Sequence, residues 1–475
     1  MKKYLKILVM LCLILVVPVG ALCLQNTVVK ETFEGSVSTG GEQKENPAPY
    51  DPDDLRRLGL EPFSSELPVL MVDTKEQEIL KDSTIWVEVA VLDDVSGAND
   101  ITAAPQEVLN ATIKYRGASS YSGFDKPQYR LEFYKKAGGK ELEYDLFGLG
   151  ADSEWVLNGP YLDRSLLRNY LMYHLAEEIM DWAPASTFCE LFVDGRYQGV
   201  YLAVEPITDG ASRLRLSRFG LVSGATPYIV KRDRVGTEEN VLHTYGELAG
   251  YTGNELSVSY PGKSKLTQRQ LQWIEQDISE FERALYSDYF ADPQVGYAKY
   301  INVDSFVDYF ILNEFSMNHD AGGLSTYAYK ELGGKLQLAV WDFNNGFDNY
   351  RWFEVETDEF LTNSNYWFDR LIEDRGFVQR VEERYRQLRQ TNLSDENIQR
   401  ILERGQQELG DAVERNFALW GYTFKNDLLA IVDDSGVSRD PNNYQQALEM
   451  LEETIEERLA FLDTSISELY EGCVN

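Results

Sequence analysis

The sequence predicts an α+β protein with two lobes, and three observations lead to this prediction. Strand patterns dominate residues 67–206, and helical patterns dominate the chain beyond residue 353. The length of 475 residues exceeds what one hydrophobic core usually organises. With 43% apolar and 26% charged residues, the composition is that of a folded globular protein, which excludes a mainly disordered or fibrous chain.

The beginning of the chain has the pattern of an export signal. Three lysines within the first six residues precede an uncharged run over 7–24, and the small residues Val19-Gly20-Ala21 are typical of a cleavage site. We expect a signal peptide over 1–21 and a flexible tether over 22–66, rich in Gly, Ser, Pro and acids. If it is not cleaved, the same run is just long enough to anchor the chain in a membrane. An exported protein, extracellular or tethered at the cell surface, fits both alternatives.

Residues 67–206 are predicted to form the strand-rich N-terminal lobe. The pair Asp194-Gly195 between two apolar segments is the strongest signal for a tight hairpin. Leucines at helical spacing predict one helix over 163–180. The expected strands cover 67–72, 85–92, 109–115, 129–134, 188–193 and 196–204.

Residues 207–475 are predicted to form the helix-rich C-terminal lobe. Its first part, at about 207–300, has a mixed pattern with one helix over 267–285, and we expect it to be an insertion. A helix over 304–317 and two short strands, 325–330 and 335–340, follow. Long amphipathic helices are predicted over 365–389, 395–419 and 444–469.

The charge and the scattered histidines and cysteines exclude several functions. The chain has 78 acidic against 45 basic residues, a formal net charge of −33, which repels nucleic acids and favours basic partners. Nucleic-acid binding is therefore not expected. The three histidines and four cysteines lie far apart without metal-site spacing, so neither a histidine or cysteine metal site nor a disulfide framework is predicted.

A polar loop and the strand after it have residues suited to binding phosphates. The loop over 116–123 contains glycines that permit close backbone approach and serines that donate hydrogen bonds. Lys126 and Arg130 follow on the polar side of the next strand. Because the loop matches no standard phosphate-binding motif, an ordinary hairpin loop with solvated strand residues is also consistent with this pattern.

Two aspartates are candidates for a site that binds metal and performs chemistry. Asp342 ends a mostly apolar strand, where a rigid and partly desolvated carboxylate can bind Mg²⁺. Asp320 follows the end of a helix, and a compact hairpin joins it to Asp342, so the two can converge. Glu205 ends the earlier hairpin, where a two-lobed enzyme would have its hinge. The two aspartates could equally serve as ordinary capping residues of turns. Glu205 could equally be a solvent-exposed residue without a functional role.

Taken together, these residues resemble the CotH family, atypical protein kinases whose lobes are similar to the protein-kinase fold. The resemblance covers residues 67–348. It rests on an ordered series of motifs: Arg116-Gly117-Ala118-Ser119-Ser120, Lys126 with Arg130, Trp155-Val156-Leu157, Asp163-Arg164-Ser165-Leu166-Leu167-Arg168-Asn169, residues 192–201 with Glu205, Asn313-Glu314, Asn318 with Asp320, and Trp341-Asp342-Phe343.

The resemblance implies transfer of the γ-phosphate of ATP to Ser or Thr of a protein, with Mg²⁺. In that scheme Asp320 is the catalytic base, and Asp342 holds the metal together with Asn344. The phosphates and nucleotide are held by Arg116, Gly117, Ser119, Ser120, Lys126, Arg130 and Glu205. Since the chain is acidic, the expected partner is a protein substrate rich in Lys and Ser.

Some features depart from the family pattern and keep other functions open. Asn344 stands where the family usually has an acid, and Ser325-Thr326 stand where it tends to have an Asn. Export would also send the domain to a compartment where ATP is scarce. The alternative is an inactive kinase-like binding or scaffold protein at the cell surface or spore envelope. A secreted glycan-binding or glycan-cleaving enzyme is a third possibility, although no two carboxylates are paired at a defined separation.

Overall fold

The computed structural model describes residues 50–94, 97–217, 224–234, 240–251, 254–362, 365–429 and 438–474. These residues belong to one compact unit, residues 48–475. The predicted signal peptide and the first part of the predicted tether lie outside the described residues. None of the helices in the described ranges is long and apolar enough to cross a membrane.

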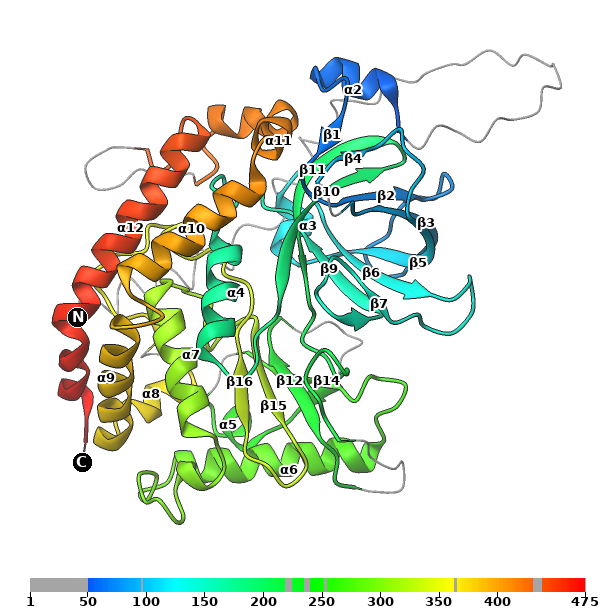
Figure 1. The fold of residues 1–475 in the computed structure, drawn as a ribbon. Coiled ribbons are helices and arrows are strands. Elements are labelled where there is room, and N and C mark those ends of the chain that lie inside the picture. The colour runs from blue at the N-terminus through cyan, green and yellow to red at the C-terminus, as the bar shows by residue number, and fades with distance from the viewer. Residues whose placement is uncertain are drawn as a thin grey trace, which may run out of the picture. The chain divides into compact units, whose positions relative to one another are not determined.

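Within the described ranges, seven strands of the N-terminal half close into a barrel (Figure 1). All neighbouring strands are antiparallel except β10 and β2, whose parallel pairing closes the barrel. In β3 buried and exposed residues alternate, as the period of two predicts. The predicted strands are confirmed, and the barrel order is β10 (Ser186–Val193), β11 (Arg196–Val204), β9 (Glu154–Asn158), β6 (Gln128–Tyr134), β5 (Glu107–Arg116), β3 (Ile85–Leu92) and β2 (Val69–Asp73).

The hairpin between β10 and β11 turns at Asp194 and Gly195, as predicted. Their φ angles are 49° and 77°, both left-handed, which a two-residue hairpin turn requires. The Asp194 carboxylate also accepts a hydrogen bond of 2.8 Å from the backbone N–H of Thr74. The turn is therefore tied to the end of β2 as well.

Residues 50–66 correct the prediction of a flexible tether up to residue 66. They form helix α2 (Pro52–Leu58) and strand β1 (Ser64–Ser65), which pairs with β4 (Asn99–Asp100). The Asp51 carboxylate accepts a hydrogen bond from the Asp53 N–H, and Gly59 ends the helix with a φ of 73°. Leu55 is buried in an apolar cluster with Phe63 and Tyr197. A Pro- and Asp-rich sequence is therefore ordered here by its caps and by one buried leucine.

The second sheet was not predicted, and it draws on the segment 207–300, for which the sequence indicated only a mixed pattern. The sheet is antiparallel, and three of its five described strands come from that segment. β12 is its central strand and pairs with both β14 and β15. These strands have only three to five residues each, too few for a clear periodic pattern. The order is β13 (Asn240–Leu242), β14 (Leu256–Tyr260), β12 (Tyr228–Arg232), β15 (Thr326–Lys330) and β16 (Gln337–Ala339).

Two of the predicted long helices are each divided into two. Residues 365–389 form α8 (Trp367–Leu371) and α9 (Arg375–Arg389), because Asp374 caps a new helix by accepting a hydrogen bond from the Gly376 N–H. Residues 395–419 form α10 (Asp395–Leu409) and α11 (Ala412–Trp420), separated at Gly410 with a φ of 43°. The other predicted helices are confirmed as α4 (Arg168–Ile179), α6 (Gln268–Leu285), α7 (Val303–Phe315) and α12 (Tyr444–Ser465).

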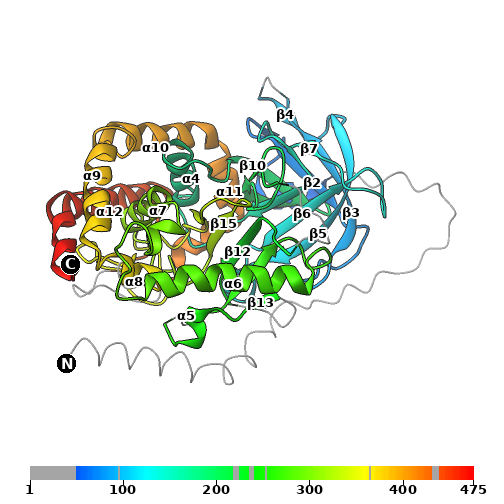
Figure 2. The ribbon, with the colours of Figure 1, turned by 90° about the horizontal axis from the view of Figure 1, so that it is seen from below.

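Helix α6 lies along the second sheet (Figure 2). Asp277 of α6 accepts hydrogen bonds from the Tyr228 hydroxyl at 2.7 Å and from the Lys330 ammonium at 2.7 Å. Ile274 and Ile278 are buried on the same helix. Both polar and apolar contacts therefore attach α6 to β12 and β15.

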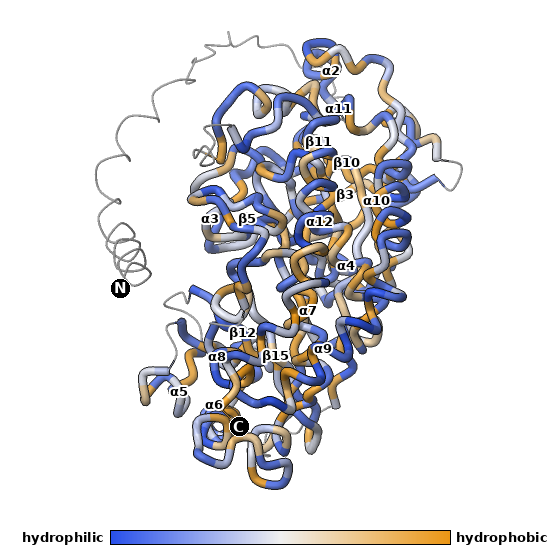
Figure 3. Tube along the Cα trace, turned by 90° about the vertical axis from the view of Figure 1, so that its left-hand side faces the viewer, coloured by the Kyte–Doolittle hydropathy of each residue, from blue (hydrophilic) through white to orange (hydrophobic). Residues whose placement is uncertain are grey.

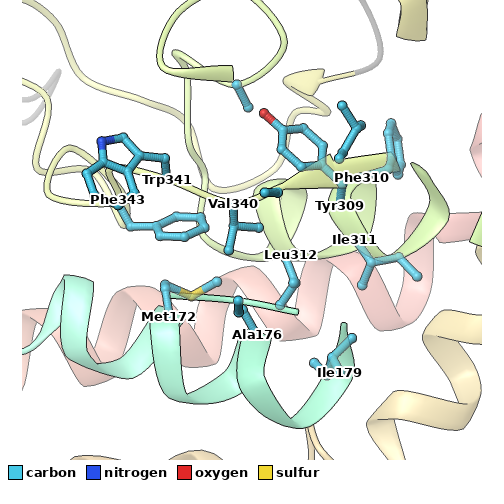
Figure 4. Packing of buried hydrophobic residues seen from close by; sticks show 14 of the residues in the cluster. Met172, Ala176, Ile179, Tyr309, Phe310, Ile311, Leu312, Val340, Trp341 and Phe343 are labelled. Carbon is cyan, nitrogen blue, oxygen red and sulfur yellow. The ribbon is translucent and has the colours of Figure 1, made fainter. Parts of the chain in front are cut away.

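One apolar core joins the two predicted lobes. It contains Leu202 of the barrel, most of α4 and α7, and apolar residues of α9, α10 and α12. Figure 4 shows Met172 and Ala176 of α4 near Val340 and Phe343. Helix α7 is apolar along most of its length, whereas hydrophilic and hydrophobic residues alternate in α10 (Figure 3). The protein is therefore of the α+β class, and its division into kinase-like lobes stays a prediction.

A buried ion pair attaches α12 to α7. Arg458 donates to the Glu314 carboxylate at 2.7 Å, and both side chains are at most 1% exposed. The backbone N–H groups of Leu361 and Thr362 donate to the same carboxylate. Because a buried charge without a partner costs far more than an exposed one, this pair is essential to the packing of α12.

We expect Arg458→Ala to destabilise the protein by about 3–5 kcal/mol, because Glu314 would keep a buried and uncompensated charge. Arg386→Ala is the control, since Arg386 pairs with Glu382 on the helix surface, and it should cost less than about 0.5 kcal/mol. Urea unfolding followed by tryptophan fluorescence measures both. Equal losses in the two variants would contradict the structural role of the buried pair.

Candidate functional site

Asp342 is held at the end of the second sheet by helix α4. It follows β16 after Val340 and Trp341 and has a φ of 63°, a left-handed conformation that is rare for aspartate. Its backbone N–H donates to the Tyr173 hydroxyl oxygen at 3.2 Å. The next N–H, of Phe343, donates to the Asn169 side chain at 2.7 Å. Two side chains of α4 therefore fix the backbone that carries this carboxylate.

The loop after Asp342 is attached to the segment 163–168. Arg168 donates from Nε to the Gly346 carbonyl at 3.0 Å and from Nη2 to the Phe347 carbonyl at 3.3 Å. Its Nη1 pairs with Asp163 at 2.7 Å. The resemblance motif over 163–169 thus has a clear physical role, because it positions the loop that begins at Asp342.

Asp320 is placed by two buried asparagines at the end of α7. Asn318 donates from its side chain to Asn313 at 3.0 Å, and its own side-chain oxygen accepts the Asp320 N–H at 3.3 Å. Asn345 donates to Oδ2 of Asp320 at 3.2 Å. Oδ1 of Asp320 accepts no hydrogen bond from any residue that the structure describes, so this oxygen is able to accept one from a ligand.

Asn344, the predicted second metal ligand, contacts Asp320 only through its neighbour. Its side chain donates to the Asn345 side-chain oxygen at 3.0 Å, and its carbonyl accepts from Asn349 at 2.7 Å. The residue that bridges the Asp342 loop to Asp320 is therefore Asn345. Sequence reasoning missed Asn345 because the two asparagines are adjacent and identical.

The two predicted acids, Asp320 and Asp342, lie close enough for their charges to interact. The pKa of Asp342 is raised from 3.8 to about 6, chiefly because the carboxyl group is buried; Arg116 lowers this pKa, and the carboxylates Asp320 and Asp233 raise it. Ser325 donates a weak hydrogen bond of 3.4 Å to its Oδ2. Like charges that crowd one buried carboxylate in this way favour binding of a cation.

Arg116 lies beside this carboxylate group. Its guanidinium carbon is 5.3 Å from the centre of the Trp341 ring, and its Nη1 donates to Gln128 at 3.1 Å. The loop after it begins with Gly117, whose φ of 81° is unfavourable for other residues. A Cβ at Gly117 would lie 1.9 Å from the Ser120 hydroxyl oxygen. The turn therefore requires glycine, and the predicted open loop contains a short helix, α3 (Ser119–Gly123).

Arg116 acts on the charge of Lys81 together with Lys114 and Lys231, and sequence reasoning selected none of these three lysines. Lys81 donates to the Gly117 carbonyl, and burial together with the charges of Arg116, Lys114 and Lys231 lowers its pKa. We call Lys81, Lys114, Arg116 and Lys231 the cationic cluster. Its members come from the segment before β3, from β5 and from β12, so no local sequence signal could have found it.

Ser119 links the barrel loop to the second sheet. Its hydroxyl oxygen accepts a hydrogen bond of 3.2 Å from Arg234, which follows β12. Ser120, by contrast, is buried. Of the predicted loop residues, Arg116, Gly117 and Ser119 thus lie at the junction with the carboxylates or with β12, while Ser120 packs inside its own turn.

Lys126 lies in a different environment. Its side chain is fully buried, and its ammonium donates to the Val200 carbonyl at 2.7 Å and to Asn416 of α11 at 2.9 Å. The ammonium also lies 5.1 Å from the centre of the Tyr201 ring. Burial lowers its pKa well below 10.5. In this structure Lys126 therefore joins α11 to the barrel.

Arg130 and Glu205 are also engaged in structural pairs. Arg130 pairs with Glu154 at 2.7 Å and lies opposite Lys114 in the register of β5 and β6. Glu205 is buried, pairs with Arg213 and accepts the Ala185 N–H at 2.9 Å. Arg130 therefore borders the cationic cluster, whereas Glu205 fixes the end of β11.

The donor set is suited to Mg²⁺ rather than to a softer metal. In the described part of the chain, no three His, Cys, Asp or Glu side chains form a group that could hold a metal alone. Mg²⁺ usually binds through one or two carboxylates and takes its other ligands from phosphates and water. Asp342, crowded by Asp320 and Asp233, fits that mode of binding.

Comparisons with known proteins identify relatives of this chain. The model of the family described as CotH kinase protein matches residues 113–462. The inner spore coat protein H of Bacillus subtilis (strain 168) is 25% identical over 288 residues, which cover 59% of this chain and 69% of that protein.

We expect Asp342→Asn to stabilise the protein at neutral pH. Since the pKa of Asp342 is raised from 3.8 to about 6, its negative charge costs folding free energy above pH 6, and this cost disappears below about pH 4. The variant should gain about 1–3 kcal/mol near pH 7.5 and nothing near pH 4. Urea unfolding at both pH values measures the difference, with Asp304→Asn at an exposed position as control. A loss of stability near pH 7.5 would refute the assigned electrostatics.

Proposed function

The chain belongs to the CotH family of kinase proteins, and on this premise we propose that it transfers the γ-phosphate of ATP to Ser or Thr hydroxyls of a protein, with Mg²⁺. The observation that carries the proposal is the meeting of the cationic cluster with the carboxylates Asp320 and Asp342. These groups come from the barrel, from β12 and from the loops after α7 and β16.

The cationic cluster is the part of the site that would bind the nucleotide phosphates. Lysine and arginine side chains attract phosphate oxygens, and several cations in one place suit a polyphosphate chain better than a single phosphate. Arg116 would contact the phosphates nearest Asp342, because it acts on both that carboxylate and Lys81. Lys126 and Arg130, which the resemblance assigns to phosphate binding, would support the barrel beside the cluster.

Asp320 is proposed as the catalytic base. In the transfer, the acceptor oxygen forms a bond to the γ-phosphorus as the bond to the β–γ bridging oxygen breaks, and the acceptor proton passes to a carboxylate. Oδ1 of Asp320 is available to accept that proton, while Asn345 holds Oδ2. Asp342 and Asn344 would hold Mg²⁺, which would neutralise charge on the phosphates when bound.

The place of action and the substrate are proposed from the relative and the charge. The name of the Bacillus subtilis relative places that protein in the inner spore coat, and we propose a spore-associated site for this chain too. The predicted leader at 1–21 would allow export or tethering to a membrane. A net charge of −33 favours a substrate rich in lysine around its Ser or Thr.

We expect Asp320→Asn to keep Mg²⁺-ATP binding but to lower phosphoryl transfer by roughly 100-fold or more, because only the base is lost. Asp342→Asn should lose the rise in unfolding temperature that Mg²⁺-ATP gives the native protein. Radiolabel transfer to a Lys- and Ser-rich peptide and thermal unfolding with and without Mg²⁺-ATP measure the two effects.

Asp304→Asn serves as the control for both variants, since Asp304 is an exposed acid at the start of α7. If native protein shows no metal-dependent shift at millimolar nucleotide, the proposal fails, and the inactive scaffold predicted as the alternative function becomes the better explanation. Phosphoryl transfer by Asp342→Asn at the rate of the native protein would refute the proposed role of Asp342 in binding Mg²⁺.

We expect Lys81→Ala and Lys231→Ala to weaken ATP binding by about tenfold each and adenosine binding hardly at all, because their charges act on the phosphates. Lys335→Ala is the matched control, since this lysine is exposed and donates to the Ala298 carbonyl. Isothermal titration with ATP, ADP and adenosine measures the series. Equal effects on ATP and adenosine would show that the lysines act on the fold and not on the phosphates.

A further inference from the structure

A groove lies on the surface between α10 and α12, in the helical C-terminal part of the chain. Its volume is about 300 Å³. The floor is apolar and is made by Ile398 and Leu402 of α10 and by Ile455 and Leu459 of α12. Exposed Gln399 lies at its edge. The size and lining suit one or two apolar side chains of a bound segment.

The two ends of the groove differ in charge. At one end Arg389 neutralises two acids, with contacts of 2.9 Å to Asp395 and 3.0 Å to Asp463. At the other end lie Glu452 and Glu456, one helical turn apart on α12. In the part of the chain that the structure describes, neither of these glutamates is in an ion pair.

No cation among the described residues forms an ion pair that would relieve the repulsion between these glutamates. Like charges four residues apart on a helix destabilise it. Partial burial raises the pKa of Glu452, and the charges of Glu456, Glu449 and Glu403 raise it further. Residues 444–457 contain no lysine or arginine. The nearest cations of α10, Arg400 and Arg404, contact other acids outside the groove.

We propose that this groove binds a lysine- or arginine-rich protein segment that places apolar side chains between α10 and α12. The apolar floor would hold leucine-like side chains, and Glu452 with Glu456 would pair with flanking cations. The proposal goes beyond the kinase function and does not depend on it. If the chain is an active kinase, the groove offers its substrate a second contact away from the site of transfer.

The test measures binding of a labelled synthetic peptide to the full-length chain by fluorescence anisotropy, without nucleotide. The peptide has about 15 residues of lysine and leucine, with the leucines at helical spacing. One control peptide has glutamate in place of lysine, and another has serine in place of leucine. We expect only the lysine–leucine peptide to bind, and we expect added salt to weaken its binding.

The matched variants lie on the same helix. Glu452→Gln with Glu456→Gln should weaken binding about tenfold, whereas Glu453→Gln with Glu457→Gln, an equal loss of charge at exposed positions outside the groove, should change it less than about twofold. Gln399→Trp should block the groove and weaken binding to a similar extent. Unchanged thermal unfolding of each variant would show that the fold is intact.

Several outcomes would overturn the proposal. Equal weakening by the two double variants would show that only the overall negative charge attracts the peptide. Full binding by Gln399→Trp, or no binding by the native chain, would equally exclude the groove as the site. A dimer in light scattering that Gln399→Trp dissociates would assign the groove to a second copy of the chain instead. Because no nucleotide is present, none of these results depends on the proposed kinase activity.

Discussion

The attachment of the Asp342 backbone to helix α4 is the constraint on which the rest of the site depends. Asn169 and Tyr173 accept the two backbone N–H groups, and Arg168 donates to carbonyls farther along the loop. Helix α4 is itself buried in the common core. A left-handed Asp342 persists because these bonds hold it from several sides, which is how proteins maintain strained backbone at functional positions.

Charge of both signs is concentrated around this loop. Asp320 and Asp233 repel the carboxylate of Asp342, and the other members of the cationic cluster repel the ammonium of Lys81. The positive charges partly compensate the negative ones, since Arg116 lowers the pKa of Asp342. A ligand with anionic phosphates and a divalent cation would relieve both repulsions at once, and this physical match is the basis of the kinase proposal.

Buried polar contacts connect the C-terminal part of the chain to earlier elements. Lys126 joins the barrel to α11, Arg164 pairs with Asp440, and Arg458 joins α12 to Glu314 of α7. Together with the continuous apolar core, these contacts make the helices beyond residue 353 part of the same folded unit. Their outer surface carries the acidic groove, so one helix, α12, contributes both to stability and to the proposed docking surface.

The sequence alone determined six of the seven barrel strands, all except β9, as well as the Asp194 hairpin and the placing of Asp320 and Asp342 after α7 and β16, because periodicity and turn residues are local properties. It did not reveal the caps that order residues 50–66 or the short strands of the second sheet. Only the tertiary structure decided which cations meet the carboxylates. Lys126 and Lys81 look alike in the sequence, yet Asn416 and Tyr201 enclose the first while Gly117 and Arg116 surround the second. The partners of a long charged side chain come from distant segments, and therefore they depend on the fold.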